Sequence, residues 1–451
     1  MRDLFVLGLL GVAILFAFRY PFVGILGWTW ISFLNPHRLS FGLAFDFPIA
    51  MAMGVAVILA FIFSKEPKKP PPYPLFWIVV FLVFWIGVTT LFAHDPEWSK
   101  DKWETSTKVL LMALLAAVML TTRERVHAMV WLVVVTLGYF GVKGGVFTII
   151  TAGSYRVWGP LGTFIQDNNQ LALALITTLP LMYYLATTTP YRWMKIGLWC
   201  GICMMFFSIL GSQSRGALVG IVAMAGFFVW RTRYKAPAII ASLLLLFVGA
   251  SFVPDHWIER MQTIDDWETD GSAMGRIYAW TFAVKLALDN PITGGGFHVS
   301  SISDLFFSYV PEGHVAKAFH SIWFEMLGAH GFVGLAIFIT MLYLSWSNCS
   351  LVRRKTREIP QLHWAYDLAS MLQVSLIGYM ATGTFVNLAF FDLIYTLIAV
   401  IIGMRVVVER ELKASKAAEQ RSRRPLRGRG PGPLPKPGIS GAGASRRQRS
   451  V

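Results

Sequence analysis

Residues 320–346, HSIWFEMLGAHGFVGLAIFITMLYLSW, decide the structural class of this protein. The stretch contains no Lys or Arg and a single carboxylate, Glu325. A helix needs roughly 20 consecutive apolar residues to cross the hydrocarbon core of a bilayer, and this run is long enough. It therefore predicts a membrane-spanning helix. A carboxylate inside such a helix is costly unless it is paired or functional, so Glu325 becomes a candidate catalytic residue.

The rest of the chain repeats this pattern. Of its 451 residues, 55% are hydrophobic and only 14% are charged, whereas a soluble domain has about 25% charged residues. We therefore predict an all-α, polytopic membrane fold with about 12 transmembrane helices. Residues 3–34 form either two short spans or one broken span. The other predicted spans are 45–63, 74–93, 107–121, 127–150, 169–187, 193–210, 214–230, 237–253, 320–346, 366–386 and 388–408.

The basic residues of the short loops predict the orientation. Lys and Arg gather in every second loop, and such loops face the cytoplasm. An N-terminus on the cytoplasmic side gives twelve spans, and one on the other side gives thirteen. We therefore expect a multi-pass protein of the bacterial inner membrane. The basic clusters are Lys65, Lys68 and Lys69; Arg123 and Arg125; Arg192 and Lys195; Arg231, Arg233 and Lys235; and Arg353, Arg354, Lys355 and Arg357.

Two segments differ from the spans. Residues 254–318 hold nine acids against four Lys and Arg, and we expect them to form short helices on the periplasmic membrane surface. A loop of this length is usually functional. Residues 413–451 hold eleven Lys and Arg against one acid, which accounts for +10 of the net charge of +15. This charge predicts a disordered tail near anionic membrane lipids and no nucleic-acid partner.

These features divide the chain into four predicted regions. A core carries the long loop, and transmembrane helices flank it on both sides. The regions are an N-terminal transmembrane block, 1–194; the core, 195–346, with its periplasmic loop 254–318; C-terminal transmembrane helices, 347–410; and a disordered basic cytoplasmic tail, 411–451.

Three arginines fall on the predicted periplasmic side. Arg156 precedes the 169–187 span, Arg215 opens the 214–230 span, and Arg276 lies in the long loop. Helix N-termini favour anions, and a guanidinium binds phosphate oxygens in bidentate fashion. These arginines predict a diphosphate-binding site at the outer ends of the helices.

His320 supplies the expected base. Its pKa lies near neutrality, which suits proton removal from a hydroxyl, and Glu325 follows just over one turn deeper. The long loop has no D-x-D pair and the chain has no histidine cluster with ligand spacing, so we predict neither a metal nor a cofactor.

Each candidate also has a structural interpretation. Arg215 fits an interfacial residue whose charge reaches the headgroups, and Arg156 fits an ordinary loop arginine. Asp167 and Asn168 fit a helix cap better than a catalytic pair. His320 taken alone fits an interfacial histidine.

Several motifs resemble the bacterial O-antigen ligase/polymerase family. They are SQSRGALVG at 212–220, NPITGGGFH at 290–298 and HSIWFEMLGAHGFVGL at 320–335. With KGGVFTI at 143–149, RVWGPLGTFIQDNNQLALAL at 156–175 and WISFLNPHRLSFG at 30–42, they are similar to the exosortase-associated O-glycosylation ligase subset.

The resemblance implies a metal-independent, inverting membrane glycosyltransferase that faces the periplasm. It would move a glycan from an undecaprenyl-diphosphate carrier to an acceptor hydroxyl. Arg215 and Arg276 would bind the diphosphate, and His320 would activate the acceptor. Relatives often carry an acid where this chain has Ala329, which leaves Glu325 as the only carboxylate on that helix.

Two other functions stay open at this stage. A polysaccharide polymerase of the same family would use a second glycan as acceptor. A transporter of lipid-linked glycan would show inverted repeats and charges at the membrane midplane, whereas the ionisable residues here crowd one side. The acceptor is a protein, a lipid or a glycan.

Overall fold

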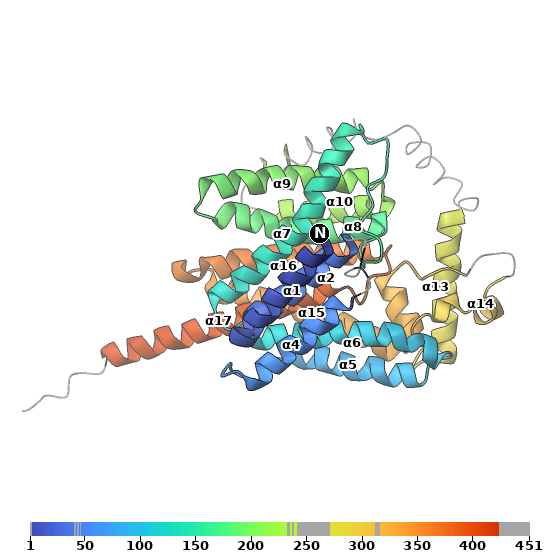
Figure 1. The fold of residues 1–451 in the computed structure, drawn as a ribbon, viewed down its shortest axis with the longest axis horizontal. Helices are drawn as coiled ribbons and strands as arrows, with labels where there is room; N and C mark the ends of the chain where they lie inside the picture. The colour runs from blue at the N-terminus through green and yellow to red at the C-terminus, as the bar shows by residue number, and fades with distance from the viewer. Residues whose placement is uncertain are drawn as a thin grey trace, which may run out of the picture. The chain divides into compact units, whose positions relative to one another are not determined.

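The computed structural model describes residues 2–39, 42, 45, 47–231, 235–236, 239–240, 271–311 and 316–423, and these residues form helices and no strand (Figure 1). The α-helices are α1 (Arg2–Arg19), α2 (Pro21–Leu34), α4 (Ile49–Phe63), α5 (Pro74–Leu91), α6 (Pro96–Met119), α7 (Arg123–Ile150), α8 (Asn168–Thr188), α9 (Arg192–Gly211), α10 (Arg215–Arg231), α13 (Gly271–Asp289), α14 (Ser303–Tyr309), α15 (Ile322–Thr356), α16 (His363–Gly383) and α17 (Asp392–Arg423). Short 3₁₀ turns are η1 (Pro36–Leu39), η2 (Val299–Ser301) and η3 (Pro360–Leu362).

The helices begin where local sequence signals place them. Pro74 and Pro96 occupy the first turns of α5 and α6, where the missing proline N–H costs no hydrogen bond. Asp95 caps α6 by accepting a hydrogen bond of 2.9 Å from the Trp98 N–H. Apolar runs therefore become helices whose ends are set by proline and capping side chains.

The N-terminal segment forms two helices. α1 and α2 meet at Tyr20, and Pro21 starts the second helix because proline cannot continue the first. A Cβ added at Gly24 would lie 2.7 Å from the Ala17 Cβ, so the helices pack closely beside the break. At the far end, Asp3 lies against Gly42, which follows η1. The two helices are therefore antiparallel, and the number of spans in residues 3–34 stays a prediction.

Five helices in the described part of the chain are long and apolar enough to cross a membrane: α5, α7, α8, α9 and α15. Two shorter apolar helices cover Val6–Arg19 and Ile49–Phe63. α6 begins with polar turns and α10 has only 17 residues, so neither adds to the five. The described part of the chain is thus all-helical, and its long apolar helices are those of a membrane protein. The total of about 12 spans stays a prediction, and the predicted span 237–253 lies almost wholly outside the described residues.

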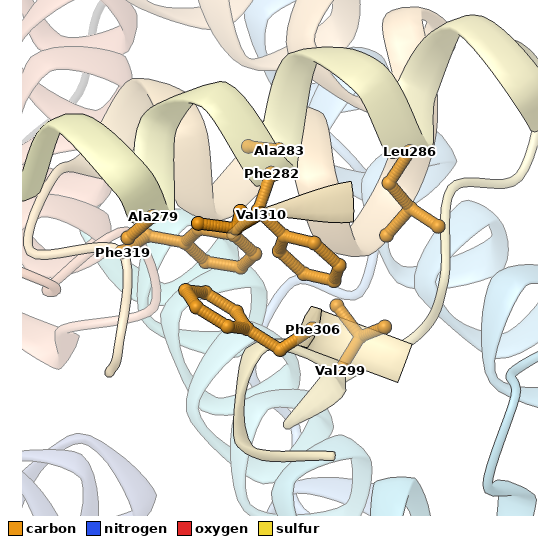
Figure 2. Close-up of a cluster of buried hydrophobic side chains, with 8 residues drawn as sticks. All are labelled: Ala279, Phe282, Ala283, Leu286, Val299, Phe306, Val310 and Phe319. Atoms are coloured by element: carbon orange, nitrogen blue, oxygen red, sulfur yellow. The ribbon is translucent and has the colours of Figure 1, made fainter. Parts of the chain in front are cut away.

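The described part of the predicted periplasmic loop folds around a small core of its own. α13 is a helix of 19 residues, longer than the short helices expected, and it packs against α15. Figure 2 shows its apolar side facing the return segment, where aromatic rings fill the space. The cluster consists of Ala279, Phe282, Ala283, Leu286, Val299, Phe306, Val310 and Phe319. Residues 254–270 lie outside the described part.

A kink in α15 fixes the glycine-rich turn of the same loop. Gly331 has φ +67° and ψ −172°, a conformation open essentially to glycine alone. The N–H groups of Gly295 and Gly296 each donate a hydrogen bond of 2.9 Å to carbonyls of the turn before the kink. The Phe332 N–H then donates to Pro291 O at 2.9 Å. The NPITGGGFH motif therefore attaches the loop to α15.

The C-terminal helix enters the predicted tail. α17 runs from Asp392 to Arg423, so residues 411–423 are helical, whereas the sequence analysis expected disorder from 411 onward. Alternating acidic and basic residues with several alanines favour a helix here. The chain divides into two compact units, Met1–Val408 and Glu409–Val451. Residues 424–451, with most of the basic charge, lie outside the described part.

Candidate functional site

The first turn of α8 ties two predicted periplasmic loops together. Asp167 forms a capping box with Gln170 and accepts a hydrogen bond of 2.9 Å from the Asn169 N–H, which confirms the helix-cap interpretation. Asn168 is buried, and its Nδ2 donates to Ser212 O at 2.6 Å. The loop before α8 is thereby held against the turn between α9 and α10.

That turn places Arg156 next to the start of α10. Arg156 Nε donates to Gln213 Oε1 at 3.4 Å, and Gln213 Nε2 donates to Gly153 O at 3.0 Å. Gln213 has φ +52°, a left-handed conformation that is uncommon outside glycine. Arg215, the first residue of α10, follows two positions later. Two of the three predicted phosphate-binding arginines therefore lie at one turn.

His320 lies at the point where α15 begins. Its side chain is exposed and its φ of +46° is also left-handed. The pKa of the His320 imidazole is lowered, first by partial desolvation, then by the positive charge of Arg276, with a smaller effect of Lys317; Asp167 opposes this shift. These three charged groups come from two separate loops, the loop before α8 and the predicted periplasmic loop. The imidazole is therefore neutral near pH 7 and able to accept a proton.

The first turns of α10 and α15 both pack against the turn that follows α16. A Cβ on Gly216 of α10 would lie 2.8 Å from the Phe385 Cβ. Trp323 Nε1 of α15 donates to Thr384 Oγ1 at 3.0 Å. The turn after α16 therefore contacts the first turns of both α10, which begins with Arg215, and α15, which follows His320.

The charged groups that act on His320 are not the one that acts on Glu325. Glu325 is 5% exposed, and its Oε2 accepts a hydrogen bond of 2.9 Å from the Ala389 N–H. Lys102 is the charged group that acts on it. Glu325 thus has the partner that a buried carboxylate needs, but this partner is the backbone of the turn after α16, not His320.

Lys317 is a member of the cluster that the sequence analysis missed. A Cβ on Gly275 would lie 2.9 Å from Lys317 Nζ, so this lysine reaches the first turns of α13 next to Arg276. The position of Lys317, three residues before His320, could have indicated from the sequence that this lysine lies near the predicted base. Across the described ranges, no three His, Cys, Asp or Glu side chains gather as metal ligands; metal independence stays a prediction.

Two family models match the chain, each over a different part of it. Residues 200–339 match the family described as O-Antigen ligase. The chain contains an O-antigen ligase domain. A domain of this family implies a membrane enzyme that transfers or ligates a glycan. Its general partners are a lipid-linked glycan and an acceptor. The domain includes Arg215, Arg276, His320 and Glu325.

The N-terminal half matches a different description. Residues 1–190, which include Arg156, match a family of unknown function. No curated protein matches the chain significantly. Arg156, which contacts Gln213 in the ligase domain, therefore shows that the candidate site draws on both matched regions.

Proposed function

We propose that this protein transfers a glycan from an undecaprenyl-diphosphate carrier to an acceptor hydroxyl on the periplasmic side of the inner membrane. The observation that supports this proposal best is the position of His320 at the start of α15, where the charges of Arg276, Lys317 and Asp167 act on its imidazole. A neutral base beside cations is suited to deprotonating a hydroxyl while an anionic leaving group departs. The positions of Arg215 and Arg156 beside the same α8 turn add to this support.

In the proposed reaction, His320 takes the proton of the acceptor hydroxyl. The acceptor oxygen forms a new bond to the sugar carbon that carries the phosphate, and the bond from that carbon to the phosphate oxygen breaks. The diphosphate leaves on its lipid, and Arg215 and Arg276 stabilise its growing charge, with Arg156 as a further cation. Direct displacement inverts the anomeric centre. No step needs a metal.

Glu325 has a positioning role in this mechanism. Its bond to the Ala389 N–H holds the turn after α16, against which the first turns of α10 and α15 pack. Loss of that carboxylate would shift both helix starts without removing a group that touches the substrate.

The resemblance to exosortase-associated O-glycosylation ligases makes a protein the first class of acceptor to test. The experiment combines the purified protein, a lipid-diphosphate glycan and candidate protein, lipid and glycan acceptors, with mass spectrometry of every product. A product that grows by repeated glycan units on the lipid carrier would indicate a polymerase instead.

Two variants test the assigned roles. Arg215→Lys keeps the charge but loses the bidentate fork, and we expect transfer to fall by about a hundredfold or more. His320→Ala should reduce transfer by about a hundred- to ten-thousandfold while donor binding survives. Arg354→Lys, an exposed residue near the other end of α15, is the matched control and should keep full activity. Normal transfer by both site variants would refute the proposed function.

A further inference from the structure

Two arginines lie together at the ends of α10 and α15 that are opposite the predicted transfer site. Arg231 is the last residue of α10, which begins with Arg215, and Arg353 lies in the last turn of α15, which follows His320. Both helices pack against α16. The basic clusters of the sequence predict that this end faces the cytoplasm, so the two arginines take no part in the proposed transfer.

Both guanidinium groups converge on one buried amide. Arg231 Nη2 and Arg353 Nη1 each donate a hydrogen bond to Gln373 Oε1, the second at 3.3 Å. Gln373 is fully buried, and its Nε2 donates to Ser350 Oγ at 2.8 Å and to Trp346 O at 3.3 Å. These bonds to α15 fix the direction of the amide oxygen. A neutral oxygen therefore holds two like charges side by side.

The other partners of the two arginines are neutral as well. Arg353 donates to Ser370 Oγ at 2.8 Å and to the Tyr366 hydroxyl at 3.2 Å. The Arg231 guanidinium lies 5.6 Å from the centre of the Trp230 ring, and its Nε is buried without an acceptor among the described residues. Aromatic rings and hydroxyls position a cation without cancelling its charge. The pair thus keeps both its charge and a free donor.

Within the described ranges, neither arginine forms an ion pair with a carboxylate. Asp367 lies in the first turns of α16, but the charged group that acts on it is His363, and Asp367 itself acts on Tyr183 of α8. Arg231 instead experiences the like charge of Arg353. Since two adjacent cations repel each other, an anion beside them would stabilise both.

The neighbouring sequence adds mostly positive charge. Residues 232–254, which continue from Arg231, contain no Asp or Glu but include Arg233 and Lys235. The five residues after Arg353 hold three cations and one acid: Arg354, Lys355, Arg357 and Glu358. The chain next to the two arginines therefore does not balance their charge.

The arginines lie at a surface that lipid can reach. Both side chains are only half-buried. Trp230, next to Arg231, is 68% exposed, and exposed tryptophans of membrane helices favour the level of the lipid headgroups. Val219 and Val222, earlier on α10, are exposed as well. A lipid can therefore lay an acyl chain along α10 while its phosphate meets the arginines.

Phosphate oxygens match the planar fork of a guanidinium, which binds them in bidentate fashion. We infer that Arg231 and Arg353 bind the phosphodiester headgroup of an anionic phospholipid, which bridges α10 and α15. Basic sites between transmembrane helices on the cytoplasmic side are suited to cardiolipin headgroups. Cardiolipin carries two phosphodiesters, which suits two adjacent cations, so it is the probe for the test.

Native mass spectrometry of the full-length protein in detergent with added cardiolipin tests the inference. The double variant Arg231→Ala/Arg353→Ala should bind cardiolipin at least about tenfold more weakly than the native protein, because a hydrogen bond to a charged group contributes about that factor or more. Arg354→Ala/Arg357→Ala removes the same charge from exposed neighbours. This matched control should keep the native affinity.

A further variant separates loss of binding from loss of folding. Gln373→Glu places a carboxylate where both arginines already donate, so it should occupy them and keep the helices together. We expect native elution in size-exclusion chromatography and cardiolipin binding at least about tenfold weaker. Native affinity in this folded variant would overturn the inference.

The lipid comparisons identify the ligand. We expect phosphatidylethanolamine, which has no net charge, to bind more weakly than cardiolipin, and millimolar inorganic phosphate not to displace cardiolipin. No binding by the native protein, equal weakening in the Arg354→Ala/Arg357→Ala control, or equal binding of phosphatidylethanolamine would overturn the inference. Displacement by inorganic phosphate would indicate a site for a free anion and would overturn it too.

Discussion

Gly331 offers the sharpest test of how the long loop is attached to α15. Its φ of +67° and ψ of −172° leave no low-energy conformation for a side chain. A Cβ there would collide with Ile292 O and lie 2.8 Å from Pro291 O, both on the glycine-rich turn. These neighbours are backbone atoms, so a rotamer change cannot relieve the contact. Gly331→Ala must move the loop or straighten the helix.

The cost can be estimated from its two parts. A residue with a side chain in this region of backbone space costs about 1–3 kcal/mol. Overpacking against a fixed backbone costs roughly 1–3 kcal/mol more. The expected loss is therefore about 2–6 kcal/mol in the attachment of the loop, a large part of the stability of a typical domain. Because Arg276 belongs to that loop, transfer should fall together with stability.

Thermal unfolding in detergent and a transfer assay measure the two effects. Gly226→Ala is the matched control: Gly226 lies within α10 with no atom near its missing Cβ, so alanine should leave stability unchanged or raise it by up to about 1 kcal/mol. A Gly331→Ala protein with native melting temperature and native transfer would show that the loop is not held at the kink, and the described attachment would be wrong.

Two further predictions concern the transfer chemistry. Arg276→Gln removes a positive charge that lowers the pKa of His320; the pKa should rise, and since the neutral imidazole is the active form, the acid limb of kcat/KM should move to higher pH. An unchanged acid limb would show that the Arg276 charge does not affect the pKa of His320. Transfer should also persist in excess EDTA because arginines and helix N-termini bind the diphosphate; loss with rescue by magnesium would contradict the arginine site.

Local patterns determined much of this protein in advance. Long apolar runs predicted membrane helices because backbone N–H and C=O groups in the bilayer core find no water and must hydrogen-bond to one another. Asp167 was predictable as a cap because capping needs only a side chain and the next few N–H groups. The motifs around Arg215 and His320 predicted the O-antigen ligase family, which the match over residues 200–339 confirms.

Contacts across the fold were decided only by tertiary structure. The sequence places Glu325 just over one turn beyond His320, but His320 precedes the helix in a left-handed conformation, so helical periodicity does not relate their directions. Glu325 instead meets Ala389, 64 residues away. Periodicity sets which residues share one helix face, whereas only packing brings separate helices and loops together.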